Sequence, residues 1–365
     1  MKLTHATRRE LARTVREAIP ADRQLYLDFG GCIIRADSST DELHAALADY
    51  FKEFVGASAD PAIVVSAHET PDVECVLDFE VKQPDPGKTK IKEEWVDLPD
   101  GRAVRKRLTG MHYVFGGGEN VAVGPCLANA NQIINFINNR FIEWKLNRGG
   151  LLGHASGVVH NGRGLSLAGF SGAGKSTLAL HLMSRGTTFV SNDRVMVEPE
   201  GDGLAMYGVA KQPRINPGTA LNNPDLAGVV DPQQCERFLA LPPDELWQLE
   251  HKYDALIDEC YGPGRFVLKS PMDALVILNW RRGAGAMHAA LVDPRERRDL
   301  LPAFMKGTGL FYLADDPARQ DDPDEDAYAG MLSRADLIEI SGGVDFERAA
   351  DICLGYMATG RLTEA

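Results

Sequence analysis

The sequence predicts an α/β fold in which a larger α/β domain follows a smaller α+β domain. Three observations lead to this prediction. The chain has 365 residues, about twice the length of a typical domain. Residues 155–193 follow the order strand, strand, glycine-rich loop, helix and strand, which is typical of an α/β core. Residues 1–125 mix strand and helix patterns and contain no recognisable catalytic motif.

The composition excludes several classes of protein. Formal net charge is -13, so we expect neither a nucleic acid nor a membrane surface as partner. The six cysteines are far apart and form no C-x-x-C pair, which disfavours a zinc site and favours reduced thiols in the cytoplasm. Residues 1–20 lack the apolar segment of a signal peptide, and no run of about 18 apolar residues predicts a membrane span.

The first domain is expected over residues 1–125, where it is a candidate for recruiting a substrate. Apolar residues recur at helical spacing after Thr40 or Asp41, either of which is a suitable N-cap. The expected elements are an amphipathic helix at 1–20, a strand pair at 23–38, a helix at 41–55, strands at 62–68 and 74–81, a polar loop or hairpin at 82–102 and a strand pair at 110–125.

The second domain is expected over residues 126–365. Two strands around an Asn161-Gly162 turn lead into the glycine-rich loop. The acidic, proline-bearing segment 315–328 is expected to be a mobile surface loop. The remaining expected elements are helices at 128–150, 175–186, 243–262 and 345–357, and strands at 155–169, 187–193, 273–280 and 335–343.

A phosphate-binding loop is the clearest chemical signal in the chain. Residues 169–176 match G-x-x-x-x-G-K-[ST] at every fixed position, between an apolar strand and an apolar-periodic helix. The glycines let backbone N–H groups point at phosphate oxygens, and the helix that follows adds its positive end. Lys175 is expected to reach the β- and γ-phosphates of ATP, and the Ser176 hydroxyl to bind Mg²⁺. The expected nucleotide-binding residues are Gly169, Ser171, Gly172, Ala173, Gly174, Lys175, Ser176 and Thr177.

The position of the next acid narrows the class of nucleotide-binding protein. No N-K-x-D motif is present, which disfavours a GTPase. Asp193 ends the strand that follows the loop helix, only eighteen residues after Lys175. Most P-loop ATPases place their second acid on a strand well downstream, so this spacing is unusual for them. We expect Asp193 to bind Mg²⁺ together with Ser176.

Residues 154–198 resemble the catalytic core of HPr kinase/phosphorylase and, more broadly, of P-loop kinases related to phosphoenolpyruvate carboxykinase. Besides the loop, the similarity includes His154, fifteen residues before Gly169, and Arg185-Gly186 at the helix end. The whole chain is most similar to the group called HPr kinase-related kinase B. The resemblance implies an HPr-kinase/PEP-carboxykinase-like catalytic domain that moves the γ-phosphoryl group of ATP to a hydroxyl of a protein serine or a small molecule. It implies a catalytic role for His154, Lys175 and Asp193.

Two departures from the family leave the mechanism open. Asn192 stands where the family has an aspartate that accepts the proton of the attacking hydroxyl, and an amide cannot act as that base. Asp193 alone, or His154, could replace it; otherwise the protein binds nucleotide without efficient transfer. Lys211 and Arg214 lie where the family has a glutamate-bearing segment. Arg214 could neutralise charge in the transition state or form a surface salt bridge.

Several alternatives follow. A nucleotide sensor without catalysis and an ATPase without an acceptor are the other candidate functions. Asp258 and Glu259 either complete a metal site or lie on a solvated helix face. The phosphate acceptor is not identified by any motif, and a homo-oligomer is compatible with the sequence without being specified by it.

Overall fold

The computed structural model describes residues 1–84, 89–242, 245–246, 249, 251–316 and 324–362. The protein is a mixed α/β molecule with several sheets, and it divides into two compact units. Unit 1 contains residues 1–148 and 308–321, and unit 2 contains residues 149–307 and 322–365. This boundary differs from the predicted one after residue 125, because helix α3 (Ala130–Leu146) packs against strands of unit 1.

Unit 1 is built on an eight-stranded sheet. The predicted strand pairs at residues 23–38 and 110–125 are present as antiparallel neighbours, and the segment at 82–102 contributes to a hairpin. Only the contacts of β3 with β4 and of β4 with β10 are parallel within this sheet. The order is β2 (Arg23–Asp28), β3 (Ile33–Ser38), β4 (Ile63–Glu69), β10 (Glu119–Gly124), β9 (His112–Gly116), β8 (Gly101–Lys106), β7 (Glu93–Leu98) and β6 (Glu80–Val81); β1 (Lys2–Leu3) and β5 (Glu74–Cys75) form a separate pair.

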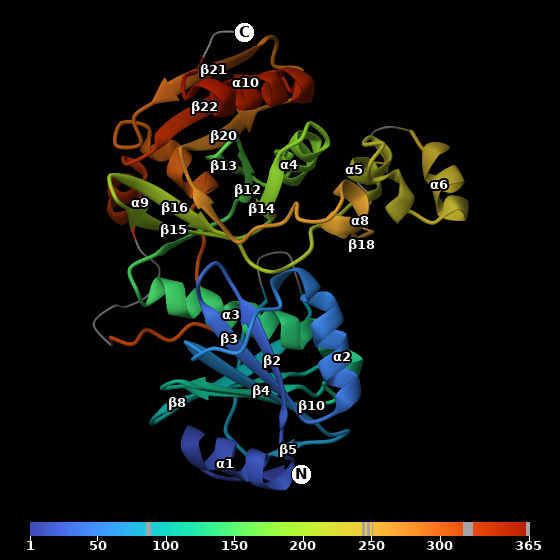
Figure 1. Cartoon of the computed structure of the whole chain (residues 1–365), viewed down its shortest axis with the longest axis vertical. Coiled ribbons are helices and arrows are strands. Elements are labelled where there is room, and N and C mark those ends of the chain that lie inside the picture. Colours follow the sequence, from blue (N-terminus) through green and yellow to red (C-terminus); the bar gives the residue numbers. More distant parts are fainter. Residues whose placement is uncertain (85–88, 243–244, 247–248, 250, 317–323, 363–365) are drawn as a thin grey trace. The chain divides into compact units, whose positions relative to one another are not determined.

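Helices cover both faces of this sheet (Figure 1). Successive side chains of a strand point to opposite faces. Val114 belongs to the core beneath α1 (Arg8–Ala18), whereas its neighbours Tyr113 and Phe115 contact Phe136 of α3. Helix α2 (Asp41–Tyr50) packs beside α3, and the Thr40 side chain caps it by accepting a hydrogen bond from the Leu43 N–H, as predicted. Short 3₁₀ turns occur at Lys52–Phe54 and Leu127–Asn129.

The central sheet of unit 2 has six strands. The predicted turn between β12 and β13 is confirmed, with Asn161 and Gly162 both in the left-handed region. Strands β13, β20 and β22 are parallel, but β12 lies between β13 and β14, so the predicted βαβ crossover spans an intervening antiparallel strand. The order is β14 (Thr188–Ser191), β12 (Ser156–His160), β13 (Arg163–Gly169), β20 (Ala274–Trp280), β22 (Asp336–Gly342) and β21 (Met287–Val292).

Unit 2 has three layers. Val276 and Leu278 of β20 face helices α4 (Lys175–Ser184) and α10 (Phe346–Thr359) in one buried core. Leu275 and Ile277 point the other way, into a core shared with a second sheet and with α9 (Glu325–Leu332). The second sheet has the order β11 (Leu151–Gly153), β15 (Val195–Glu200), β16 (Gly203–Tyr207) and β19 (Lys269–Pro271), and a 3₁₀ turn (Arg298–Ala303) adds to this layer.

The long helix predicted at residues 243–262 is not continuous: residues 245–246 are helical, but the chain is extended at 253–254 before a short helix follows. Strand β18 (Tyr253–Asp254) pairs there with β17 (Arg214–Ile215), and only α8 (Ile257–Tyr261) is helical after it. Backbone pairing with a segment forty residues earlier overrides the local helical pattern. The rest of this region contains α5 (Pro217–Leu221), a 3₁₀ turn (Ala227–Val229) and α6 (Pro232–Leu239).

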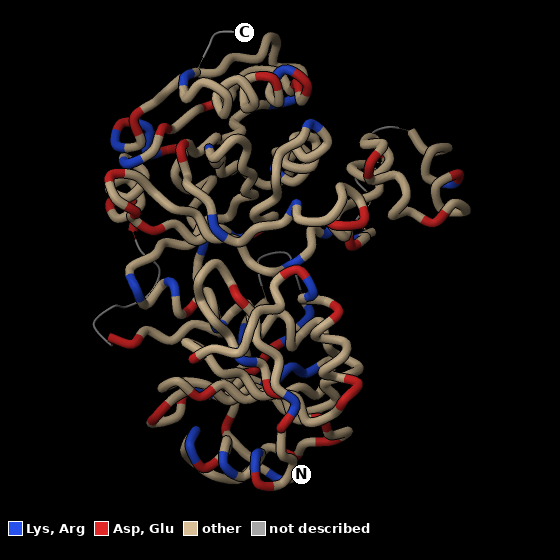
Figure 2. The backbone as a smooth tube through the Cα atoms, in the orientation of Figure 1, with Lys and Arg blue, Asp and Glu red and all other residues tan. Residues whose placement is uncertain are grey.

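The acidic segment predicted as a surface loop is only partly described. Residues 317–323 lie outside the described residues, and α9 begins at Glu325 with Asp324 as its N-cap. Acidic and basic side chains are interspersed along both units (Figure 2). Among the described residues, no helix is both long enough and apolar enough to cross a bilayer.

Candidate nucleotide-binding site

The glycine-rich loop connects β13 to α4, and its glycines are required by its shape. Gly172 and Gly174 have φ values of +78° and +89°, which side chains rarely permit. A Cβ on Gly174 would also lie 2.6 Å from the ring of Phe346. Gly169 has an ordinary φ, but a Cβ there would lie 2.9 Å from the Cβ of Ala173. The loop therefore depends on glycine for backbone conformation at two positions and for space at two.

The loop presents unpaired backbone donors. The N–H groups of Gly172, Gly174, Lys175 and Ser176 have no hydrogen-bond partner among the described residues, whereas the Ala173 N–H donates to the Phe170 carbonyl at 3.0 Å. Helix α4 begins at Lys175 with no side-chain cap. The first N–H groups of a helix together with its dipole form a site for anions.

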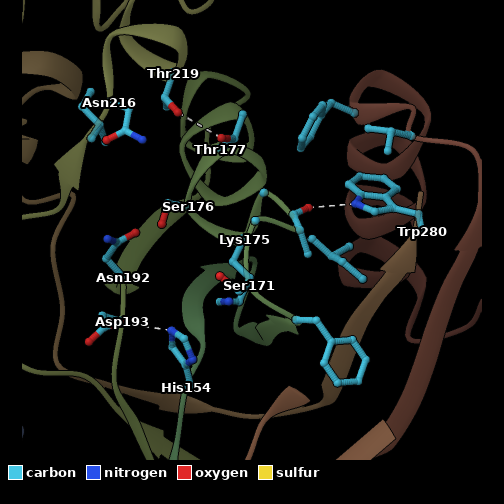
Figure 3. A pocket seen from close by; sticks show the side chains of 18 of the residues that line it. His154, Ser171, Lys175, Ser176, Thr177, Asn192, Asp193, Asn216, Thr219 and Trp280 are labelled. Carbon is cyan, nitrogen blue, oxygen red and sulfur yellow. Dashed lines mark hydrogen bonds and ion pairs between the residues drawn. The ribbon is translucent and has the colours of Figure 1, made fainter. Parts of the chain in front are cut away.

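Two aromatic residues, Trp280 and Phe346, pack against the loop. The indole N–H of Trp280, at the end of β20, donates to the Ala173 carbonyl at 2.8 Å (Figure 3). The Trp280 ring also meets the Phe346 ring edge to face, with centroids 5.0 Å apart. Phe346 in turn fills the space beside Gly174. The loop is thus fixed by contacts with segments more than a hundred residues further along the chain.

Lys175 is directed back along the loop. Its ammonium group donates to the carbonyl of Gly169 at 2.9 Å. Burial lowers the pKa of Lys175, while nearby Asp193 acts in the opposite direction. A partly buried ammonium group without a full counter-charge is well suited to bind an anion.

Asp193 and His154 form a pair that lines the same cavity as the loop. Asp193 follows β14, His154 follows β11, and the His154 Nε2 lies 3.2 Å from Asp193 Oδ1 (Figure 3). The other carboxylate oxygen lies 3.7 Å from Arg194 Nε and 3.9 Å from Lys306 Nζ. The hydrogen bond with His154 and these cations hold the pKa of Asp193 well below its usual range, against the effect of burial. Asp193 is therefore ionised throughout the neutral range.

Asn192 lies between this pair and the loop. Its side chain points toward Ser176 (Figure 3), and its Oδ1 is buried without a hydrogen-bond partner among the described residues. Its backbone carbonyl accepts a hydrogen bond from the Ser156 hydroxyl at 2.7 Å. An amide oxygen cannot accept a proton at neutral pH, but it can coordinate a hard cation.

Residues outside the sequence motif also lie close to the loop. Thr219 of α5 lies 3.1 Å, hydroxyl to hydroxyl, from Thr177 at the start of α4. Arg214 of β17 forms a salt bridge with Asp254, one of its two predicted roles, with Nε 3.2 Å from Oδ1. Its exposed side chain also lines the cavity. Arg214 was a candidate from the sequence, but no sequence signal linked Thr219 to the loop, because only the packing of α5 brings it there.

These residues enclose one cavity of about 1070 Å³ in unit 2. All the predicted site residues except Gly169 line it, and the roles given to them remain predictions. The residues of the lining that sequence reasoning missed include Asn216, Thr219, Lys252, Trp280, Arg281, Arg282 and Phe346.

The other weighed candidates fall outside this lining. Lys211, Asp258 and Glu259 are absent from it, and His160 ends β12 next to the Asn161-Gly162 turn. Within the described part of the chain, no group of three or more His, Cys, Asp or Glu side chains is placed to hold a metal ion.

Comparison with known proteins adds little to this description. No family model matches the chain, and no curated protein matches it. Among solved structures, the HPr(Ser) kinase/phosphatase from Coxiella burnetii aligns over 57% of this chain and 97% of its own, with 11% sequence identity and a TM-score of 0.31. The similarity is distant. The chemistry of the cavity is therefore argued from its own residues.

Proposed function

We propose that the protein is an ATP-dependent phosphotransferase that moves the γ-phosphoryl group to a hydroxyl of a protein serine or a small molecule. One observation carries this proposal: a loop with unpaired N–H groups, Lys175 and Ser176 lines the same cavity as the hydrogen-bonded pair Asp193 and His154. The sequence resemblance to HPr kinase/phosphorylase supports the same reaction.

The cavity suits a nucleoside triphosphate. Ligand cavities usually measure about 300–1,000 Å³, so a volume of about 1070 Å³ has room for a nucleotide and a small acceptor. Unpaired amides at the start of α4 match phosphate oxygens, and the partly buried ammonium of Lys175 supplies charge. Phosphoryl transfer needs mainly this kind of positioning and charge neutralisation.

The residues present also suit Mg²⁺. The Ser176 hydroxyl and the Asp193 carboxylate are hard oxygen donors, and Mg²⁺ commonly uses one or two protein carboxylates together with phosphates and waters. The unpaired Asn192 oxygen beside Ser176 is a third donor of the same kind. A bound Mg²⁺ neutralises charge on the β- and γ-phosphate oxygens.

Of the alternatives for the proton acceptor, the geometry favours His154. Asp193 has a lowered pKa, so it is a weak base. When the His154 Nε2–H donates to Asp193, the Nδ1 atom is free to take a proton, as in other pairs in which a carboxylate orients a histidine. In this reaction the acceptor oxygen bonds to the γ-phosphorus, the bond to the β,γ-bridging oxygen breaks, ADP leaves, and the hydroxyl proton goes to His154.

Replacing the loop lysine tests the nucleotide site. We expect Lys175→Ala to weaken MgATP binding at least tenfold, because it removes a charge-assisted contact worth about 1.5–3 kcal/mol. Titration calorimetry measures the affinity, and Lys269→Gln, outside the cavity, serves as control. Unchanged affinity in Lys175→Ala would contradict the assignment.

Asn192, in the position expected for the proton acceptor, favours a second candidate function, a nucleotide sensor; an ATPase without an acceptor is a third. A nucleotide sensor binds MgATP but forms no ADP with any acceptor, whereas an ATPase forms ADP at the same rate with and without an acceptor. Measuring ADP formation under both conditions separates these functions from a phosphotransferase.

A further inference from the structure

The cavity is cationic, although the chain is acidic. Five cationic side chains line it against a single carboxylate, that of Asp193, while the formal net charge of the chain is -13. An excess of one charge in a cavity concentrates ligands of the opposite charge. The five cations are Lys175, Arg214, Lys252, Arg281 and Arg282.

The phosphate loop accounts for only part of this charge. Lys175 belongs to the loop itself and contacts Gly169. The other four cations come from segments distant in sequence: Arg214 from β17, Lys252 from the residue just before β18, and two from the residues that follow β20. The nucleotide site as proposed does not require the first pair.

Arg214 and Lys252 belong to one structural feature. Ile215 pairs with Tyr253 in the β17–β18 ladder, so Lys252 is adjacent to the strand that faces Arg214. Arg214 pairs with Asp254, and both side chains are more than half exposed. Such a surface pair is weak and can exchange for a ligand anion. Lys252 forms no ion pair with any described residue.

This feature lines the same cavity as Asp193. Both Arg214 and Asp193 act on the partly buried Lys211: the pKa of its ammonium group is lowered by burial, by Arg194 and by Arg214, and raised by Asp193 and Asp254. The charges of Arg214 and Asp193 therefore both act on the same ammonium group. In a phosphotransferase the acceptor must reach the γ-phosphate, beside the residue that takes its proton.

We propose that Arg214 and Lys252 form the acceptor subsite, and that the acceptor is a hydroxyl compound which also carries a carboxylate or phosphate group. This proposal rests on the proposed phosphotransferase function and specifies its substrate class. Arg214 presents a planar fork that matches either anion, and Lys252 supplies a point charge.

Inorganic phosphate is the probe for this subsite. Protein saturated with Mg²⁺ and a non-hydrolysable ATP analogue is titrated with phosphate by calorimetry, so that the loop is already occupied. We expect phosphate to bind to this complex, and Lys252→Gln to weaken that binding at least tenfold, as loss of one charge-assisted contact predicts. The affinity for the ATP analogue should stay within twofold in Lys252→Gln. Lys269→Gln, a lysine outside the cavity, should leave both affinities unchanged.

Three results would overturn the proposal. Phosphate could bind the nucleotide-free protein only, or Lys252→Gln could bind phosphate as tightly as the unaltered protein. Alternatively, Lys252→Gln could weaken the ATP analogue instead, which would assign Lys252 to the nucleotide. Failure of the proposed function itself is distinguishable, because the protein would then form no ADP with any acceptor, as a sensor does, or form it at the same rate without an acceptor, as an ATPase does.

A transfer assay identifies the source of the anionic group. ADP formation is compared for glycerate and glycerol 3-phosphate, for a serine peptide with flanking acidic residues, and for glycerol as the neutral match. We expect at least one anionic acceptor to exceed glycerol about tenfold in kcat/KM, and Lys252→Gln to remove that preference. Equal use of glycerol and every anionic acceptor would contradict the proposal.

Discussion

At the scale of single residues, the chemistry of the cavity depends on which group stays charged and which can take a proton. Asp193 is held ionised by the hydrogen bond with His154 and by Lys306 and Arg194. Asn192 cannot take a proton and instead leaves an unpaired oxygen beside Ser176. Under the proposed function, His154 is therefore the group that we expect to take the proton of the acceptor hydroxyl.

The His154→Gln substitution tests this division of tasks. Glutamine can still donate to Asp193 but cannot accept a proton, so we expect kcat for ADP formation to fall about a hundredfold while MgATP affinity stays within twofold. Steady-state kinetics and calorimetry give the two values. His181→Gln, a histidine of α4 outside the cavity, is the matched control. An unchanged kcat would show that His154 takes no part in proton transfer.

At the scale of elements, the loop between β13 and α4 was the most predictable part of the molecule. Its pattern is contained within eight residues, and glycine is required by local backbone shape at Gly172 and Gly174. The turn at Asn161-Gly162 and the cap at Thr40 were predictable for the same reason. The helix predicted at 243–262 failed because β18 pairs with a distant strand.

Gly174→Ala tests the close contact behind the loop. The added Cβ combines a positive φ with a 2.6 Å approach to Phe346, so we expect a loss of roughly 1–3 kcal/mol in unfolding free energy and at least tenfold weaker MgATP binding. Gly186→Ala is the matched control, since Gly186 has a φ of +97° but open space around it and lies outside the cavity. If both variants bind MgATP normally, Phe346 does not shape the loop.

Strand β9 contains a buried histidine, His112, whose contribution to the stability of the fold depends on pH. His112 donates Nδ1–H to the Gly110 carbonyl, its Nε2 has no partner among the described residues, and burial lowers its pKa from 6.5 to about 4. The unfolded chain therefore binds the proton more readily between these values. Stability from the neutral ring is fully present above about pH 6.5 and is lost as pH falls to about 4.

We expect the titration of His112 to lower the unfolding free energy of unit 1 by about 3 kcal/mol as the pH falls from about 6.5 to about 4. This value follows from the difference between the pKa of the folded and the unfolded chain. Urea unfolding at several pH values measures the slope. His112→Gln should reduce it, whereas His5→Gln, at a histidine that is not buried, should not. Parallel slopes for the His112 variant and the unaltered protein would refute this origin.

At the scale of the whole molecule, the chain enters unit 1 twice. Residues 308–316 return from unit 2 and pack on unit 1, where Phe311 contacts Tyr113, Phe115 and Phe136. The fully buried guanidinium of Arg140 donates to the Phe311 carbonyl and pairs with Glu143. A sequence pattern could not reveal this arrangement, because the segment carries no signal of the unit to which it belongs.

Phe311→Ala tests the contribution of the returning segment. We expect a loss of about 2 kcal/mol in the stability of unit 1, because a partly buried aromatic ring is removed from a cluster of three others. Hydrogen exchange of the amides in β9 and α3 measures unit 1 separately. Phe170→Ala, at an exposed ring of unit 2, is the control and should leave these amides unchanged. Unaltered protection in Phe311→Ala would mean that unit 1 is stable without the segment.

The sequence by itself determined the glycine-rich loop, the strand and helix on either side of it, and the closely spaced Asp193. These features depend on backbone preferences and burial patterns that act over a few residues. Only the tertiary structure decided the pairing of His154 with Asp193 and the contacts of Trp280 and Phe346 with the loop. It also decided that Arg214 and Lys252 line the same cavity. Such contacts depend on strand order and on pairing between distant segments, which local preferences do not encode.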